Sequence, residues 1–216
     1  MGVDELAQDC KASSVKPIDV QTAIEREQRQ FLESLRLQRH DWLNHFQVIL
    51  GYMKLQRYDV CEEYIKKVTE QTNNESRIAS LGNQSLVSFL LTYNALYKEM
   101  KLEVQVPDLI NLSLLGQDEN QRFFELVKGI IDIYRENSIA NEGLPNTLVI
   151  EVQALDDSLF LAVEYEGFLK EQDCILALRS LAERLGNEEG FFVEGLHNNQ
   201  ESIMEFYFPV NQEVKE

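Results

Sequence analysis

Apolar residues recur every three or four positions through the first third of the chain, a spacing typical of an amphipathic helix. Between about Ile18 and Gln56 the chain contains no proline and only one glycine, Gly51. The positions that follow this spacing, with one polar lapse at Arg39, are Leu32, Leu35, Arg39, Trp42, Phe46, Ile49 and Met53. Such a heptad seam predicts one long helix of a helical bundle.

The helical pattern breaks near Arg57 and resumes with a second apolar stripe, made by Val60, Tyr64, Ile65 and Val68. The stripe predicts a helix over 58–72, with Asn73 and Asn74 as its stop. Two helices joined by so short a turn form an antiparallel hairpin. A hairpin alone cannot bury a two-sided seam, so we expect a homodimer in which two hairpins form a four-helix bundle. In the alternative, the hairpin packs onto the C-terminal half of its own chain.

The second half of the chain alternates between helical and strand patterns. Helices are predicted at 84–101, 118–137 and 171–185, and strands at 102–106, 147–154, 158–166, 190–196 and 202–209. This order predicts an α+β protein whose second part is an α/β sandwich with helices on one face of a mixed sheet. The predicted organisation is a polar tail at 1–17, a helical hairpin at 18–76 and an α/β domain at 77–212.

Charge and cysteine content exclude several classes of function. The formal net charge of −17 gives the chain no electrostatic footprint for nucleic acid or anionic lipid. No apolar run reaches membrane-spanning length, and the first residues lack the basic and apolar regions of a signal peptide. Cys10, Cys61 and Cys174 lie far apart without a metal-ligand spacing, which indicates a reducing compartment and no zinc site. We therefore expect a cytoplasmic protein.

The candidate chemistry lies on the first helix, around His40. His40, Asn44 and Gln47 are spaced i, i+4 and i+7 and share a helix face, and Arg36 precedes His40 by one turn. Because this face flanks the apolar seam, His40 should project into solvent. Imidazole is a competent nucleophile near neutral pH, and phosphoryl transfer mainly requires in-line positioning and charge neutralisation. A rigid helix would position the ring.

The residues around His40 suggest supporting roles. Arg36 or Arg39 would neutralise phosphoryl charge, and Asp41 would accept a proton or hydrogen bond from the ring. Asn44 and Gln47 would bind phosphoryl oxygens or order a water. A single helical histidine is more often an ordinary surface residue, so the spacing alone leaves the role of His40 open. His197 lies among polar loop residues and is expected to be solvated.

The stretch RHDWLNHFQVILGYMKLQRYDVCEEYIKKV resembles the α-helical phospho-acceptor domain of the sporulation initiation phosphotransferase B (SpoOB-type) family. The resemblance covers about 35 residues, and its positions are His40, Asp41, Asn44, Gln47, Gly51, Tyr58 and Asp59. The same pattern occurs in citrate/dicarboxylate-type sensor kinases. From about residue 77 onward, the order of elements resembles a histidine-kinase ATP-binding domain.

The second part departs from the kinase pattern where nucleotide would bind. Gly129 and Ile133 stand where the magnesium-holding asparagines of a kinase are expected, although Asn137 and Asn141 lie nearby as possible remnants. Residues 164–169 lack the aspartate and the second glycine of the nucleotide loop, and the later glycine loop is reduced to 186–190. These departures imply that the fold is kept and ATP binding is lost.

The resemblance implies a phosphorelay protein. His40 would take a phosphoryl group from the aspartate of a single-domain response regulator and pass it to a second regulator, a transcription factor that controls sporulation. The chain would bind no cofactor, since Mg²⁺ would come with the regulators. Leu37, Leu43 and Leu50 would form an apolar part of the docking surface. Two alternatives stay open: a cytosolic sensor histidine kinase with a divergent ATP site, and a non-enzymatic module that binds response regulators.

Overall fold

The computed structural model describes residues 20–140, 145–186 and 191–210, and the chain divides into two units, residues 1–47 and 48–216. Two long helices come first, α1 (Val20–Lys54) and α2 (Tyr58–Ala79). The predicted tail at 1–17 lies outside the described residues. The long first helix and the short connection to the second confirm the helical hairpin predicted from the apolar periodicity.

The turn after α1 is closed by backbone hydrogen bonds around Gln56. The amide of Arg57 donates to the carbonyl of Tyr52 at 3.0 Å, and that of Gln56 donates to Met53 at 3.0 Å. Gln56 itself has a φ of 55°, the left-handed conformation that this C-terminal capping motif requires. The motif reverses the chain within three residues, so that α2 can begin at Tyr58.

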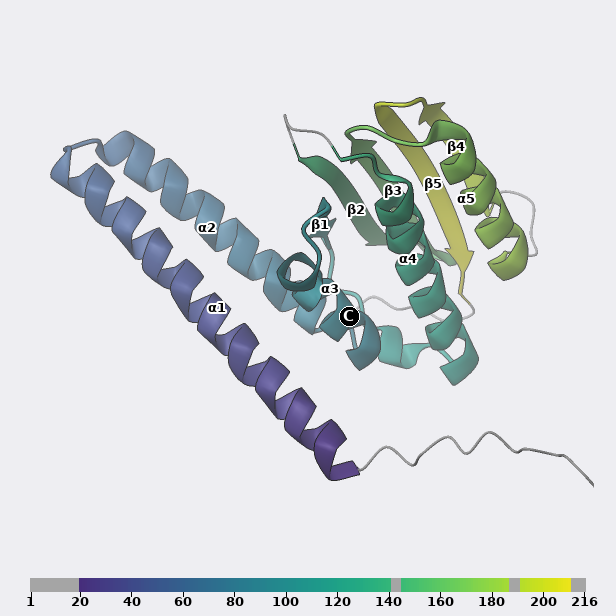
Figure 1. The fold of residues 1–216 in the computed structure, drawn as a ribbon, viewed down its shortest axis with the longest axis horizontal. Helices are drawn as coiled ribbons and strands as arrows, with labels where there is room; N and C mark the ends of the chain where they lie inside the picture. Colours follow the sequence, from purple (N-terminus) through teal and green to yellow (C-terminus); the bar gives the residue numbers. More distant parts are fainter. Residues whose placement is uncertain (1–19, 141–144, 187–190, 211–216) are drawn as a thin grey trace, which may run out of the picture. The chain divides into compact units, whose positions relative to one another are not determined.

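A five-stranded mixed sheet forms the second part of the chain, with helices against one face (Figure 1). Its strands lie in the order β1-β2-β3-β5-β4, where β1 and β2 are parallel and the other pairs are antiparallel. The strands are β1 (Met100–Gln105), β2 (Asn146–Ala154), β3 (Ser158–Glu166), β4 (Phe192–His197) and β5 (Glu201–Pro209). The helices are α3 (Gln84–Leu96), the 3-10 turn η1 (Leu112–Leu114), α4 (Gln117–Asn137) and α5 (Glu171–Leu185). The predicted α+β class and element order are confirmed.

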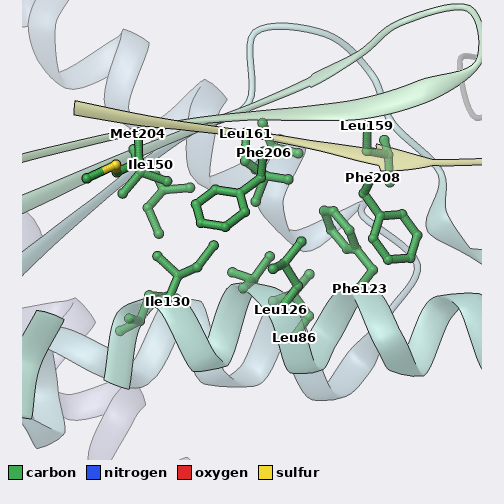
Figure 2. Close-up of a cluster of buried hydrophobic side chains, with 14 of the residues drawn as sticks. Leu86, Phe123, Leu126, Ile130, Ile150, Leu159, Leu161, Met204, Phe206 and Phe208 are labelled. Atoms are coloured by element: carbon green, nitrogen blue, oxygen red, sulfur yellow. The ribbon is translucent and has the colours of Figure 1, made fainter. Parts of the chain in front are cut away.

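The core of this part lies between the sheet and its helices. In Figure 2, Phe123, Leu126 and Ile130 of α4 point toward the sheet. The strand side chains that face them include Ile150, Leu161, Met204, Phe206 and Phe208. All of these side chains are fully buried. Burial alternates along β2, as expected for a sheet with one covered face.

Several predicted element boundaries are wrong, including those of β1, which spans Met100–Gln105 and not 102–106. Helix α2 continues to Ala79, because Asn73 and Asn74 do not stop it. Helix α3 ends at Leu96, where the chain leaves the helix to enter β1 at Met100. Strand β4 begins at Phe192, and residue 190, its predicted start, lies outside the described residues. The proposed domain boundary at 76/77 consequently falls inside α2.

Candidate functional site

His40 lies on the surface of α1. Among the described residues its ring makes two polar contacts, and both are at Nδ1. The side-chain amide of Asn44 stands 3.1 Å from Nδ1, and Asp41 Oδ1 stands 3.6 Å from it. The imidazole is 71% exposed and the Asp41 side chain 70%. The i, i+4 spacing on the helix thus brings Asn44 to the ring as an orienting group, and Nε2 points away from these two contacts.

The other predicted site residues are exposed on the same helix. Arg36, Arg39 and Gln47 all present exposed side chains. Leu43 is 53% exposed and Leu50 is 55% exposed, so both could contact a partner. The side chain of Leu37, a further predicted docking residue, lies outside the described residues. The arrangement offers a protein partner an exposed nucleophile with apolar residues at i+3 and i+10.

The apolar seam of α1 is also largely exposed in the single chain. Leu32, Leu35, Trp42, Phe46 and Met53 are between 39% and 59% exposed. Within the seam, the rings of Trp42 and Phe46 lie 6.1 Å apart between centroids. An exposed stripe of large apolar side chains at heptad spacing marks a surface that another helix would cover.

Helix α4, which contains Gly129 and Ile133, packs directly against α5. A Cβ on Gly129 would stand 2.9 Å from Leu181 Cδ1, so the glycine permits a close approach of the two helices. Ile133 is half-buried and packs against the core. Asn137 donates its side-chain amide to the carbonyl of Ile133 at 2.9 Å. Asn141 lies outside the described residues.

The backbone amides of the segment after β3 donate hydrogen bonds within the protein. The amides of Gly167 and Leu169 donate to the carbonyls of Gln200 and Asn199 at 2.9 and 3.0 Å. Phe168 donates to Asn146 Oδ1 at 3.0 Å, and Lys170 donates to the carbonyl of Asn137 at 2.9 Å. Gly167 has a φ of 148°, and a Cβ there would meet Asn146 Oδ1 at 2.2 Å. Four successive amides are therefore already satisfied by the protein.

Buried hydroxyl groups join α4 to the strand ends in this region. Tyr134 Oη and Ser202 Oγ lie 2.7 Å apart, and Ser202 Oγ lies 2.8 Å from His197 Nδ1. Burial raises the pKa of Tyr134 above its usual range, and the hydrogen bond with Ser202 offsets this in part. The ring of Tyr134 stacks on that of Tyr165, with centroids 5.3 Å apart.

The expectation that His197 is solvated is wrong. The residue ends β4 and is half-buried, and its Nε2 lies 2.9 Å from the carbonyl oxygen of Glu171. Both ring nitrogens therefore have partners. The sequence carries no signal for this network, because its members, Tyr134, Ser202, His197 and Glu171, come from four separate elements.

The described residues contain no group of three or more His, Cys, Asp or Glu side chains placed to bind a metal ion together. None of the described helices is both long and apolar enough to cross a bilayer.

Two family models match the chain in succession. The model "Sensor_kinase_SpoOB-type, alpha-helical domain" matches residues 22–81, and "Sporulation initiation phospho-transferase B, C-terminal" matches residues 82–208. The chain belongs to the SpoOB family. Sporulation initiation phosphotransferase B of Bacillus subtilis (strain 168) is 29% identical to it over 131 residues. That match spans 60% of the SpoOB-family chain and 66% of the relative, slightly less than two thirds of the relative's length.

Solved histidine kinases are also similar to this SpoOB-family chain. Histidine kinase AdeS of Acinetobacter baumannii is 13% identical, with a TM-score of 0.40, over 80% of this chain and 98% of the kinase chain. A histidine kinase from Burkholderia phymatum STM815 is also 13% identical, with a TM-score of 0.40, over 87% of this chain and 99% of the other.

Proposed function

We propose that this SpoOB-family chain is a phosphorelay histidine phosphotransferase in the control of sporulation initiation. His40 takes a phosphoryl group from the aspartate of one response regulator and passes it to the aspartate of a second. The observation that carries the proposal is the exposed ring of His40, oriented through Nδ1 by Asn44 and Asp41 on a regular helix. Exposure is required because the reacting aspartate belongs to another protein.

The transfer proceeds through Nε2 of His40. In the tautomer with the proton on Nδ1, the Nε2 lone pair attacks phosphorus; the N–P bond forms as the bond between phosphorus and the aspartate oxygen breaks. The electron pair of the broken bond returns to the aspartate, which leaves as a carboxylate. The carboxylate of Asp41, whose Oδ1 lies 3.6 Å from Nδ1, balances the charge on the phosphorylated ring. The second regulator reverses these steps with its own aspartate as the nucleophile.

Charge on the phosphoryl group is neutralised from both sides of the complex. Arg36 and Arg39 are exposed near His40 along the chain and supply positive charge from this protein. Mg²⁺ enters with the regulator, in whose acidic pocket it is held. The chain itself binds no cofactor for the transfer.

ATP is not needed, because each step exchanges one activated phosphoryl bond for another. Three features support the loss of nucleotide binding. Gly129 and Ile133 replace the expected asparagines, Leu181 of α5 lies against Gly129, and the amides of residues 167–170 have partners within the protein. Phosphate groups are bound largely by unpaired backbone amides, and this segment has none left to offer.

The functional unit is a homodimer in which the exposed seams of two hairpins close a four-helix bundle. Trp42 and Phe46, which are 39% and 54% exposed in one chain, become buried in this arrangement. The partners are a single-domain response regulator as donor and a transcription-factor regulator as acceptor. They dock on the face of α1 that holds His40, Leu43 and Gln47.

The deciding experiment is phosphoryl transfer from a radiolabelled, phosphorylated single-domain response regulator, with Mg²⁺ and without ATP. The wild type should acquire acid-labile label, and His40→Gln should not. His45→Gln, which changes a neighbouring histidine of the same helix, is the matched control and should be labelled.

Two outcomes would contradict the proposal. Labelling of His40 by ATP alone would favour a sensor kinase. Stable binding of the regulator without any label on the wild type would favour a non-enzymatic binding module. Nitrogen-15 NMR of the labelled wild type should locate the phosphorus on Nε2.

A further inference from the structure

Within the described residues, the outer edge of β1 is covered by side chains and not by another strand. β1 is the first strand in the sheet order, so β2 pairs with only one side of it. An unpaired strand edge presents backbone amides and carbonyls that must find other partners. Here the edge positions are Leu102, Val104 and Val106.

Two asparagine side chains form hydrogen bonds with the backbone of this edge, in place of a neighbouring strand. Asn94 of α3 accepts from the amide of Leu102 at 2.9 Å and donates to its carbonyl at 2.7 Å. Asn74 of α2 donates to the carbonyl of Val104 at 2.5 Å and accepts from the amide of Val106 at 2.9 Å. A side-chain amide carries the same donor and acceptor as a peptide group, so each asparagine replaces one unit of a neighbouring strand.

The contacts of Asn74 span a long stretch of chain, whereas those of Asn94 are local. Asn74 lies 30 and 32 residues before its partners, and Asn94 lies 8 residues before Leu102. Arg77, one turn after Asn74, adds a bond from Nη1 to the carbonyl of Val106 at 3.3 Å. The last turns of α2 are therefore bonded to the sheet edge at three points.

The end of α2 also packs against the core of the α/β part. Ile78 at the end of α2 is 5% exposed and belongs to the core of the α/β part. The carbonyl of Leu81, just after α2, accepts from the amide of Leu112 at 2.8 Å. The helix thus enters the α/β part without a linker, and the side chains of Asn74 and Arg77 fix its direction.

We propose that Asn74 is a positioning residue, which with Arg77 locks the sheet onto the second helix of the hairpin. A domain that carries ATP must bring its phosphate into contact with a histidine elsewhere, and such a domain needs freedom to move. A domain that only helps to dock a regulator works best when its position is fixed beforehand. The role of Asn74 in transfer rests on the proposed function, whereas the attachment of the sheet to α2 does not depend on it.

Distance measurements test the lock directly. Spin labels are placed at Lys67→Cys on α2 and Leu176→Cys on α5, two exposed positions, in a Cys10→Ser background. The native Cys61 and Cys174 are buried and resist labelling. An excess of unlabelled protein restricts the signal to pairs within one chain. The wild type should give one narrow distance distribution, and Asn74→Ala a broad one.

Asn73→Ala is the matched control, because Asn73 is the adjacent exposed asparagine of the same helix. It should keep the narrow distribution. A narrow distribution in Asn74→Ala would overturn the lock. If circular dichroism shows that Asn74→Ala is unfolded, Arg77→Ala, which removes one of the three bonds, replaces it and should broaden the distribution less.

The role in transfer has a separate readout. Asn74→Ala should raise the KM for the phosphorylated regulator by about tenfold, with kcat and the melting temperature close to those of Asn73→Ala. A broad distance distribution with an unchanged KM would overturn the positioning role. If the wild type transfers no phosphoryl group at all, the proposed function fails, and the distance distributions still decide the lock.

Discussion

At the scale of single residues, the proposed transfer through His40 depends on which ring nitrogen carries the proton. Asn44 donates toward Nδ1 in the resting ring, which leaves the proton on Nε2. Attack by Nε2 requires the other tautomer, with the proton on Nδ1. Asp41 Oδ1, 3.6 Å from Nδ1, is the group that favours this tautomer and the charged ring that follows.

Replacement of Asp41 by asparagine should therefore slow the transfer onto His40 about tenfold, because it removes the charge that stabilises the phosphorylated ring. The affinity for the response regulator should equal that of the wild type. The measurement is single-turnover transfer from a phosphorylated regulator. Asp59→Asn, an exposed aspartate at the start of α2, is the control and should transfer at the wild-type rate. Equal rates for the two variants would remove Asp41 from the mechanism.

The sequence was sufficient to predict that His40 and Asn44 share an exposed face of α1, since helical spacing determines which side chains lie together on a helix. It was not sufficient for the contact between Asn44 and Nδ1, which depends on the rotamers of both side chains. The hydroxyl network of Tyr134, Ser202 and His197 was missed for a different reason. Its members meet only through the tertiary fold.

At the scale of secondary-structure elements, α5 and β4 are joined by one ion pair. Arg179 Nη2 donates to Glu194 Oε2 at 2.7 Å, and Nε donates to the other carboxylate oxygen. The hydrogen bonds from Arg179 lower the pKa of Glu194 below the usual 4.5. Burial opposes this effect, and the positive charge of Arg179 adds a smaller lowering of its own. A lowered carboxyl pKa in the folded state stabilises the fold above the unfolded pKa.

This stabilisation should be lost as the pH falls below about 4.5 through the lowered pKa of Glu194. Glu194→Gln should lower the unfolding free energy at pH 7 by less than about 1 kcal/mol, since the pair is partly exposed and screened by water. The difference in unfolding free energy between Glu194→Gln and the wild type should disappear at acidic pH. Chemical denaturation at pH 7 and pH 3 measures this, with Glu183→Gln on α5 as the control. A deficit that persists at pH 3 would show that packing, and not charge, links the elements.

Element order was predictable because the hydrophobic period changes from about 3.6 to 2 between helices and strands. The end of α2 was not. Asn73 and Asn74 have low helix propensity, which favours a stop, but the hydrogen bonds of Asn74 to β1 keep it within the helix. Tertiary contacts that outweigh local propensity cannot be recognised from local sequence alone.

At the scale of the whole molecule, the proposed function assigns the two apolar stripes of α1 to different partners. The seam that contains Phe46 is expected to bury itself against a second copy of the chain. The face that contains His40 and Leu43 stays open to regulators in the proposed relay. Exposure in the single chain does not separate them, since Phe46 is 54% exposed and Leu43 is 53% exposed. Only the heptad register assigns one to the dimer and the other to docking.

Phe46→Asp and Leu43→Asp are therefore a matched pair: both place a carboxylate on α1 at positions of equal exposure. Phe46→Asp should convert the dimer into monomers in sedimentation velocity at micromolar concentration, because a charge in a bundle seam is buried without a partner. Leu43→Asp should remain a dimer and bind regulators more weakly. Dissociation of both variants, or of neither, would reject the assigned register, and with it the view that the two stripes have separate partners. Dissociation of Leu43→Asp alone would exchange their roles and place His40 beside the dimer seam.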